Sequence, residues 1–344
     1  MKPFAARTAA FKLAAVALTA LVAGSAFAQK LQPIRFALDW RYEGPAAPYV
    51  VAIDKGFYKA EGLEVTIDTG SSSVEGINRV ASGAYDVGFA DINSLVKFRD
   101  EPRNLEVKAV MMVYDTPAFS IITLKKNGIK APKDLEGRTL GAPAADGAFA
   151  QWPIFVRANK IDTSKIKLEN VGFPVREPML AQGKVDAIFG FWFSSYMNLK
   201  ASGVAGDDIL VLHMRDYGVD LYGNAIIANP DFMRFNPKAV AGFVRATIKG
   251  IQATAADPAG AMDSIMKRNA IANRDVELER LKLALDKNIV TADAKKNGLG
   301  GVDMKRLERS IDQIGLTFNY THKPKAADIF TDQYLPAKAQ RMIK

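Results

Sequence analysis

A short segment occurs twice in this chain and constrains its fold more than any other feature. Residues 80–90, Val-Ala-Ser-Gly-Ala-Tyr-Asp-Val-Gly-Phe-Ala, recur at 180–190 as Leu-Ala-Gln-Gly-Lys-Val-Asp-Ala-Ile-Phe-Gly, with Ala, Gly, Asp and Phe in the same register. Each copy is typical of a helix end, a glycine stop, an aspartate turn and a buried strand. Copies this far apart do not suit a solenoid, so they predict two similar α/β lobes. The alternative is a chance match of a common helix-to-strand connection.

The first 28 residues have the pattern of a cleavable export signal. Lys2, Arg7 and Lys12 form a basic start without acids, residues 13–22 are apolar, and Ala26-Phe27-Ala28 provides a small-x-small cleavage site. The apolar stretch is much shorter than the ~20 residues that a membrane-spanning helix needs. We therefore expect cleavage after Ala28 and an exported, soluble protein.

Composition excludes several classes of function. The chain has no cysteine, which excludes disulfides, thiol catalysis and thiolate metal sites. Its net charge is +9, but the cations alternate with acids rather than forming a basic stripe, so nucleic-acid binding is not expected. We expect no metal and no cofactor, and we expect a monomer.

The first lobe begins with one strand-helix-strand unit. Residues 34–38 alternate as a strand, 49–55 are typical of a helix ending at Gly56, and 63–67 alternate as a second strand. The loop between the first strand and the helix is rich in acids and aromatic rings. In open α/β sheets such loops, at the carboxyl ends of strands, bind ligands. The next loop, 69–73, brings Ser72 to a helix start, as a ligand contact or as a simple helix cap.

The second lobe repeats this plan. A loop of small residues, 142–148, opens a helix, and Asp146 in it is either a helix cap or a ligand contact. Two crossings between the lobes are predicted near residues 115–118 and 220–224. The expected division is a signal peptide at 1–28, lobe I at 29–116, lobe II at 117–221, and the rest of lobe I with C-terminal helices at 222–344. Two crossing strands would act as a hinge that closes a cleft between the lobes.

Specific runs in this chain resemble a known family. The runs are Leu38-Asp-Trp40, residues 49–65 (Tyr-Val-Val-Ala-Ile-Asp-Lys-Gly-Phe-Tyr-Lys-Ala-Glu-Gly-Leu-Glu-Val) and the Asp-Val-Gly-Phe-Ala segment ending at Ala90. From about residue 33 to 260 the chain resembles periplasmic solute-binding proteins of ABC importers, in the group that binds nitrate, sulfonates, taurine and thiamine-pyrimidine precursors. The resemblance implies a two-lobed α/β periplasmic binding protein fold of type II, a periplasmic location and a permease partner in the inner membrane. It also implies that backbone amides of the 142–148 loop face the ligand.

Enzyme chemistry is not expected. The two histidines, His213 and His322, lack the spacing of a zinc site or a serine triad, and no phosphate-binding loop is present. Eukaryotic relatives in the same family make the thiamine pyrimidine with a pyridoxal cofactor and a cysteine-rich motif, which this chain lacks. Where the pyrimidine binders show Asn and His, this chain reads Arg-Tyr-Glu-Gly-Pro-Ala-Ala at 41–47. An enzyme of the pyrimidine-synthase kind and a ligand sensor for a membrane receptor remain as alternatives.

The predicted ligand-binding residues lie at the ends of strands and helices that face the cleft. They are Asp39, Trp40, Tyr42, Glu43, Tyr49, Ser72, Asp91, Asn93, Tyr114, Asp146, Phe191, Trp192, Asp220 and Tyr222. Aromatic rings and carboxylates dominate this set, and Arg41 is the cation that stands beside it. Such a set favours a flat, nitrogen-bearing ring that stacks on Trp or Tyr and donates N–H groups to carboxylates. The alternative ligand is a small anion such as an alkylsulfonate, taurine or nitrate.

Overall fold

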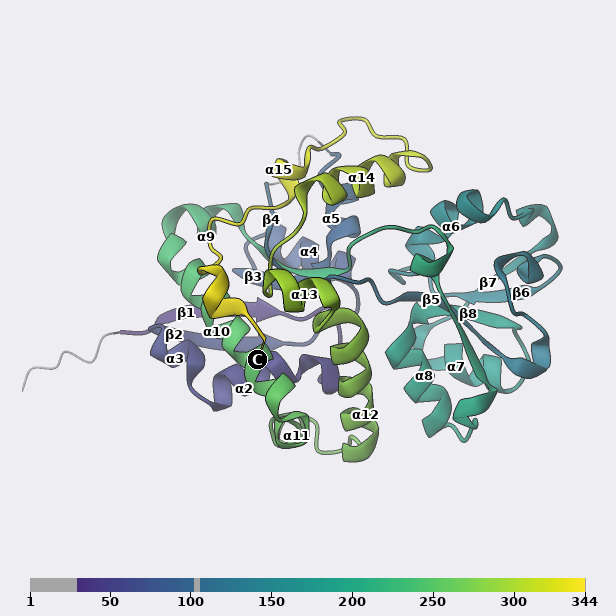
Figure 1. The fold of residues 1–344 in the computed structure, drawn as a ribbon, viewed down its shortest axis with the longest axis horizontal. Helices are drawn as coiled ribbons and strands as arrows, with labels where there is room; N and C mark the ends of the chain where they lie inside the picture. The colour runs from purple at the N-terminus through teal and green to yellow at the C-terminus, as the bar shows by residue number, and fades with distance from the viewer. Residues whose placement is uncertain (1–29, 102–105, 344) are drawn as a thin grey trace, which may run out of the picture.

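The computed structural model describes residues 30–101 and 106–343, so the predicted signal peptide lies outside the described residues. Figure 1 shows two α/β bodies side by side. One body contains both the first and the last described parts of the chain, and the other contains its middle. Each body is built on a five-stranded sheet. The internal repeat predicted two similar α/β lobes.

The sheet of the first lobe has the strand order β2-β1-β3-β10-β4. Its strands are β1 (Gln32–Ala37), β2 (Leu63–Asp68), β3 (Val87–Asp91), β4 (Lys108–Met112) and β10 (Asn224–Ala228). β1 pairs in parallel with β2 and β3, whereas β10 runs antiparallel to β3 and β4. Every residue of β3 and β10 is buried. Strands covered on both faces by helices need such continuous burial, which explains their apolar sequences.

The sheet of the second lobe has the equivalent order β7-β6-β8-β5-β9. Its strands are β5 (Phe119–Leu124), β6 (Thr139–Ala142), β7 (Lys167–Asn170), β8 (Ala187–Phe191) and β9 (Ile209–His213). β6 pairs in parallel with β7 and β8, and β5 runs antiparallel to β8 and β9. In each lobe, therefore, one antiparallel strand is inserted beside the central parallel strands.

Helices cover both sheets (Figure 1). The second lobe has α6 (Trp152–Asn159), α7 (Phe173–Ala181) and α8 (Trp192–Ala201). The first lobe has α2 (Ala47–Asp54), α3 (Phe57–Ala60), α4 (Ser73–Ala81), α5 (Ile92–Phe98), α9 (Pro230–Phe235), α10 (Pro237–Ala256), α11 (Pro258–Met266), α12 (Arg274–Ala284), α13 (Ala292–Asn297), α14 (Met304–Gly315) and α15 (Ala326–Ile329). No described helix has the length and apolar character needed to cross a membrane.

The two copies of the repeat perform the same structural task. Gly83 and Gly183 end α4 and α7 in the left-handed conformation, at φ +74° and +71°, which glycine adopts without strain. The aspartate that follows accepts a backbone N–H from the neighbouring strand in both lobes. Asp86 bonds Arg35 N at 2.7 Å, and Asp186 bonds Thr139 N at 2.8 Å. The repeated aspartate therefore fixes the strand after each helix beside its parallel neighbour.

Two connections join the lobes, one between β4 and β5 and the other between β9 and β10. They run side by side, because Tyr114 N donates to Asn224 O at 2.8 Å and Gly223 N donates to Tyr114 O at 2.9 Å. A Cβ at Gly223 would lie 2.7 Å from Tyr114 Cβ, so this approach requires glycine. The predicted boundaries at residues 116/117 and 221/222 fall within these two connections, and the division stays a prediction.

A pair of helical glycines tests how tightly the first lobe is packed. A Cβ at Gly250 of α10 would lie 2.2 Å from Pro48 O of α2, whereas a Cβ at Gly76 of α4 would lie 3.6 Å from its nearest neighbour, Phe89 O. We expect Gly250→Ala to lower the free energy of unfolding by about 2 kcal/mol because α10 must move away from α2. Gly76→Ala should raise it by about 0.5 to 1 kcal/mol, since alanine favours the helix. Urea unfolding measures both, and equal effects would contradict this packing.

Candidate functional site

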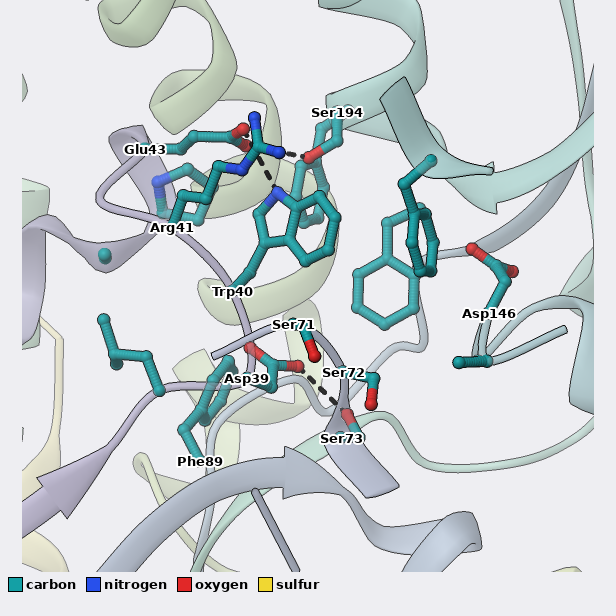
Figure 2. Close-up of a pocket in the computed structure, with 18 of the residues that line it drawn as sticks. Asp39, Trp40, Arg41, Glu43, Ser71, Ser72, Ser73, Phe89, Asp146 and Ser194 are labelled. Carbon is teal, nitrogen blue, oxygen red and sulfur yellow. Dashed lines mark hydrogen bonds between the residues drawn. The ribbon is translucent and has the colours of Figure 1, made fainter. Parts of the chain in front are cut away.

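A pocket lies between the two lobes, at the carboxyl ends of the central strands (Figure 2). The segment after β1, the loop before α4 and the side chains of Tyr49, Phe89 and Tyr114 form the wall of the first lobe. The loop after β6, helix α7 and the start of α8 form the wall of the second. Its empty space is about 810 Å³, including space open to solvent.

Eight of the fourteen predicted ligand-binding residues line this pocket. They are Asp39, Trp40, Glu43, Tyr49, Ser72, Tyr114, Asp146 and Phe191. Their contact with a ligand stays a prediction, and their protein contacts define what each can offer.

Asp39 is a buried carboxyl at the pocket wall, 9% exposed. Ser73 Oγ donates to its Oδ2 at 3.0 Å, and Asn224 Nδ2 donates to the same oxygen at 2.6 Å. Burial raises the pKa of Asp39 to about 7 against these two hydrogen bonds, and the nearby Asp91 carboxyl adds to the increase. At neutral pH this group can therefore accept a hydrogen bond as a carboxylate or donate one as an acid.

Trp40 reaches across the pocket to the second lobe. Its indole Nε1 donates to Glu43 Oε1 at 3.2 Å, and its ring centroid lies 5.0 Å from that of Phe173 in α7, at 65°. The Arg41 guanidinium lies 5.3 Å from the centre of the same indole. Trp40 therefore has a defined orientation between the lobes, and Figure 2 shows it between Glu43 and Asp39.

Glu43 joins Trp40 to the second lobe. Its Oε2 accepts a hydrogen bond from Ser194 Oγ at 3.2 Å and forms an ion pair with Arg280 of α12. Arg280 is buried and donates to Asn198 Oδ1 of α8 at 3.0 Å. Both oxygens of Glu43 are thus engaged, so this residue orients Trp40 and links the lobes.

Asp146 accepts backbone hydrogen bonds just before the short 3-10 helix at Phe149–Gln151 and also forms a buried ion pair. Its Oδ1 accepts hydrogen bonds from Ala148 N at 2.8 Å and Phe149 N at 2.9 Å, and its Oδ2 accepts one from Arg176 Nη1 at 3.0 Å. Arg176 also donates from Nη2 to Glu177 Oε1 at 2.6 Å. Burial raises the pKa of Asp146, although the Arg176 charge opposes this increase. The positive charge of Arg176 is therefore already matched by two carboxylates.

The serines before α4 are also bonded within the protein. Ser72 Oγ accepts a hydrogen bond from Glu75 N at 3.2 Å, which makes it the helix cap. Ser71 N donates to Glu75 Oε2 at 2.7 Å, and Ser73 Oγ accepts one from Asp91 N at 3.0 Å. Ser72 is therefore the N-cap of α4, and it also lines the pocket.

Three of the six predicted residues outside the pocket connect strand ends instead. Asp91 caps α5 by accepting from Asn93 N at 3.1 Å and Ser94 N at 2.9 Å. Asn93 Nδ2 donates to Tyr222 O at 2.7 Å. The hydroxyl of Tyr222 accepts from Asp303 N at 2.9 Å. Their burial has a structural cause, because backbone groups at strand and helix ends need these partners.

The other three, Tyr42, Trp192 and Asp220, do not line the pocket and contact other parts of the protein. Tyr42 donates from its hydroxyl to Ile67 O at 2.6 Å, and Trp192 donates from Nε1 to Asn288 Oδ1 at 3.1 Å. The Asp220 side chain is 58% exposed and pairs with an arginine of α14. Position at a strand end predicted their neighbourhood, but not the direction of their side chains.

Several pocket residues were not predicted: Phe173, Arg176, Phe193, Ser194 and Asn198. Arg176 and Glu177 are the charged pair in the otherwise apolar α7, Phe-Pro-Val-Arg-Glu-Pro-Met-Leu-Ala. That isolated pair was the available signal. A helix that starts at Trp192 places Ser194 and Asn198, four residues apart, on one face, which was the second signal.

Comparison with known proteins identifies the family. A family model described as NMT1/THI5 like matches residues 45–261. The chain belongs to the NMT1/THI5-like family. It is 26% identical to the formylaminopyrimidine-binding protein of Halalkalibacterium halodurans over 292 residues, which cover 83% of this chain and 86% of the relative.

Two further relatives of this chain have names that describe different activities. The riboflavin-binding protein RibY of Chloroflexus aurantiacus is 27% identical over 235 residues, covering 68% of this chain and 65% of the relative. The 4-amino-5-hydroxymethyl-2-methylpyrimidine phosphate synthase of Uromyces fabae is 26% identical over 233 residues, covering 65% and 67%. The relatives of this chain therefore include proteins named as binding proteins and proteins named as synthases.

Solved structures confirm the predicted fold. The periplasmic aliphatic sulphonate binding protein SsuA of Escherichia coli superposes with a TM-score of 0.69 at 12% identity, covering 89% of this chain and 99% of that one. The periplasmic nitrate-binding protein NrtA of Synechocystis superposes at 0.67 with 11% identity, covering 90% and 89%. The chain has the two-lobed periplasmic binding protein fold with a pocket between the lobes.

The raised pKa of Asp39 predicts a pH-dependent stability. The carboxyl titrates near 3.8 when unfolded and near 7 when folded. Its contribution to the free energy of unfolding is therefore fully present below about pH 4, falls as the pH rises, and is lost above about pH 7. At about 1.4 kcal/mol per pKa unit, the whole effect is at most about 4 kcal/mol.

We expect the wild-type protein to lose on the order of 2 kcal/mol relative to Asp39→Asn between pH 5 and pH 8. Urea unfolding at both pH values measures this difference. Asp220→Asn, which changes an exposed carboxylate, is the matched control and should follow the wild type. Parallel pH curves for wild type and Asp39→Asn would show that Asp39 titrates normally in the folded state.

Proposed function

We propose that this chain is the periplasmic substrate-binding component of an ABC importer and captures a small nitrogen-containing heterocycle by closing its lobes. The observation that carries the proposal is the composition of the pocket. Aromatic rings from both lobes surround a buried carboxyl, Asp39, and the buried arginine on the opposite wall is already paired.

The chemistry of a nitrogen heterocycle matches these groups. A flat ring gains about 0.5 to 1.5 kcal/mol beyond burial from each well-placed aromatic neighbour, and Trp40 and Phe173 present their rings at the pocket. Both side-chain donors to Asp39 use Oδ2, so no side chain of the described residues occupies Oδ1, which can accept an N–H group of the ligand. A carboxylate that accepts such a bond forms one of the stronger hydrogen bonds in proteins.

A small anion fits the same pocket less well. Nitrate or a sulfonate needs free cationic or amide donors, but Arg176 is shared between Asp146 and Glu177. Arg41 is exposed and stacks near Trp40 at the rim. Glu43 and Asp146 are paired with arginines, whereas Asp39 has no cationic partner among the described residues and would repel an anion when ionised. The likeness to SsuA and NrtA is one of fold and does not change this balance.

Binding without turnover is the expected activity. The chain has no cysteine, and no histidine or lysine is among the residues that line the pocket. His213 packs against the edge of Trp192 at 5.3 Å, outside the pocket. The pyrimidine-synthase alternative therefore lacks both the cysteine-rich motif and a lysine amine with which a pyridoxal aldehyde could react.

Two features together support a role in transport: the export-signal pattern at the start of the sequence and the pocket between the lobes. Residues 1–28 have the export-signal pattern, and the pocket lies between two lobes joined by two short connections. Such an arrangement permits closure around a ligand. A permease in the inner membrane would then receive the closed form from a monomeric receptor.

Calorimetry tests the ligand class. We expect binding of 4-amino-5-hydroxymethyl-2-methylpyrimidine or a related aminated ring, and a loss of tenfold or more in affinity for both Trp40→Ala and Asp39→Asn. The first change removes a stacking surface. In the second, the donors Ser73 and Asn224 hold the amide oxygen, so the NH2 group replaces the acceptor that faces the ligand. Phe235→Ala and Asp220→Asn change an exposed ring and an exposed carboxylate outside the pocket, and should leave the affinity unchanged. Tight binding of taurine or nitrate that ignores all four changes would favour the anion alternative.

A further inference from the structure

Two buried tyrosines and Asp39 lie together at the pocket. Tyr49 of α2 is 1% exposed and Tyr114 of the first connection is 3% exposed, yet both side chains line the pocket with Asp39. Both rings pack against Phe89. Burial, followed by the neighbouring Tyr114 and Asp39, raises the pKa of Tyr49. Burial and the Asp39 charge raise the pKa of Tyr114 in the same way. Both phenols therefore keep their protons and can donate hydrogen bonds.

Neither of these hydroxyls has a hydrogen-bond partner among the described residues. The other buried tyrosines do: Tyr58 bonds Thr247 Oγ1 at 3.0 Å, Tyr222 accepts from Asp303 N at 2.9 Å, and Tyr334 donates to Met233 O at 3.4 Å. Buried hydroxyls are nearly always satisfied by protein, water or ligand. Among the buried tyrosines that the structure describes, the two whose hydroxyls lack a protein partner thus both lie at the pocket, where a ligand would supply the partner.

The rings of Tyr49 and Tyr114 cannot easily turn away. The Tyr49 ring lies 5.2 Å from Phe36 and 5.5 Å from Phe89. The Tyr114 ring meets Phe89 edge-on at 5.2 Å and Phe193 at 6.0 Å. Phe89 thus packs against both tyrosines and fixes the two hydroxyls relative to each other. A rigid pair of donors beside a carboxyl can distinguish ligands by the order of their polar atoms.

We propose that Tyr49, Tyr114 and Asp39 together read the polar edge of the ring. The phenol hydroxyls donate to lone pairs on the ligand, such as ring nitrogens or a carbonyl oxygen, and Asp39 Oδ1 accepts the N–H group beside them. The ligand class is therefore a ring with an amino or ring N–H donor next to an acceptor, as on the edge of an aminopyrimidine. This assignment rests on the proposed function, because it specifies how the same pocket selects its ring.

The expected selectivity follows from the pocket groups that a mismatched ligand would leave without a hydrogen-bond partner. A ring of the same shape without the acceptor nitrogen would leave a buried hydroxyl unpaired, and a ring without the amine would leave Asp39 Oδ1 unpaired. Sites that bond a polar group of the ligand reject analogues lacking that group far more strongly than apolar pockets reject a missing methylene. We expect each such deletion to weaken binding by about 100-fold.

The test uses two probes and three conservative variants. The probes are 4-amino-5-hydroxymethyl-2-methylpyrimidine and the analogue in which the ring nitrogen beside the amine is replaced by C–H. The variants are Tyr49→Phe, Tyr114→Phe and, as the control, Tyr58→Phe, whose hydroxyl bonds Thr247 outside the pocket. Calorimetry measures affinity, and thermal unfolding without ligand measures stability.

We expect at least one of the two pocket variants to bind the pyrimidine tenfold or more weakly while binding the C–H analogue as the wild type does. Neither should lower the unfolding temperature of the free protein, because neither loses a protein hydrogen bond, whereas Tyr58→Phe should lower it without changing affinity. Unchanged pyrimidine affinity in both pocket variants, or a loss of stability like that of Tyr58→Phe in both, would overturn the assignment. If the wild-type protein binds neither probe, the aminopyrimidine class fails first, and the assignment fails with it.

Discussion

The buried carboxyl of Asp39 is the interaction on which both the fold and the pocket depend. Its Oδ2 receives hydrogen bonds from Ser73, the first residue of α4, and from Asn224, the first residue of β10. Ser73 in turn accepts from Asp91 N at the end of β3. One carboxyl thus links the ends of three strands and the start of a helix, and its cost of burial appears as a pKa raised to about 7. A buried carboxyl with a strongly raised pKa at a pocket wall is typical of a binding site.

The contacts between the lobes extend from this point. Trp40, the residue after Asp39, meets Phe173 of the second lobe and donates to Glu43, which pairs with Ser194 and Arg280. Helix α12, which carries Arg280, also pairs with α8 through Glu279 and Lys200 at 2.6 Å. Trp40 and Glu43 therefore both line the pocket and make contacts between the lobes. The proposed binding of a ring would thus be coupled to closure of the lobes, because these two residues both line the pocket and contact the second lobe.

The sequence predicted the architecture because the repeat and the strand ends are local patterns. Gly83 with Asp86, and Gly183 with Asp186, perform equivalent tasks in the two lobes, and the loop after β1 contributes Asp39 and Trp40 to the pocket. Tyr42 and Trp192 follow the same local rule but point into protein contacts, since side-chain direction depends on tertiary packing. Arg176 escaped prediction because its partner Asp146 lies 30 residues away, and no local pattern pairs them.

The central claim is that this protein captures a nitrogen-containing ring and releases it unchanged. The most direct measurement is mass spectrometry of the compound released by denaturing the purified protein, after exposure to a small-molecule extract of its native cells and removal of unbound compounds. We expect one unaltered heterocycle that carries an N–H donor beside an acceptor. Release of a sulfonate or nitrate, or of a compound that the protein has chemically changed, would contradict it.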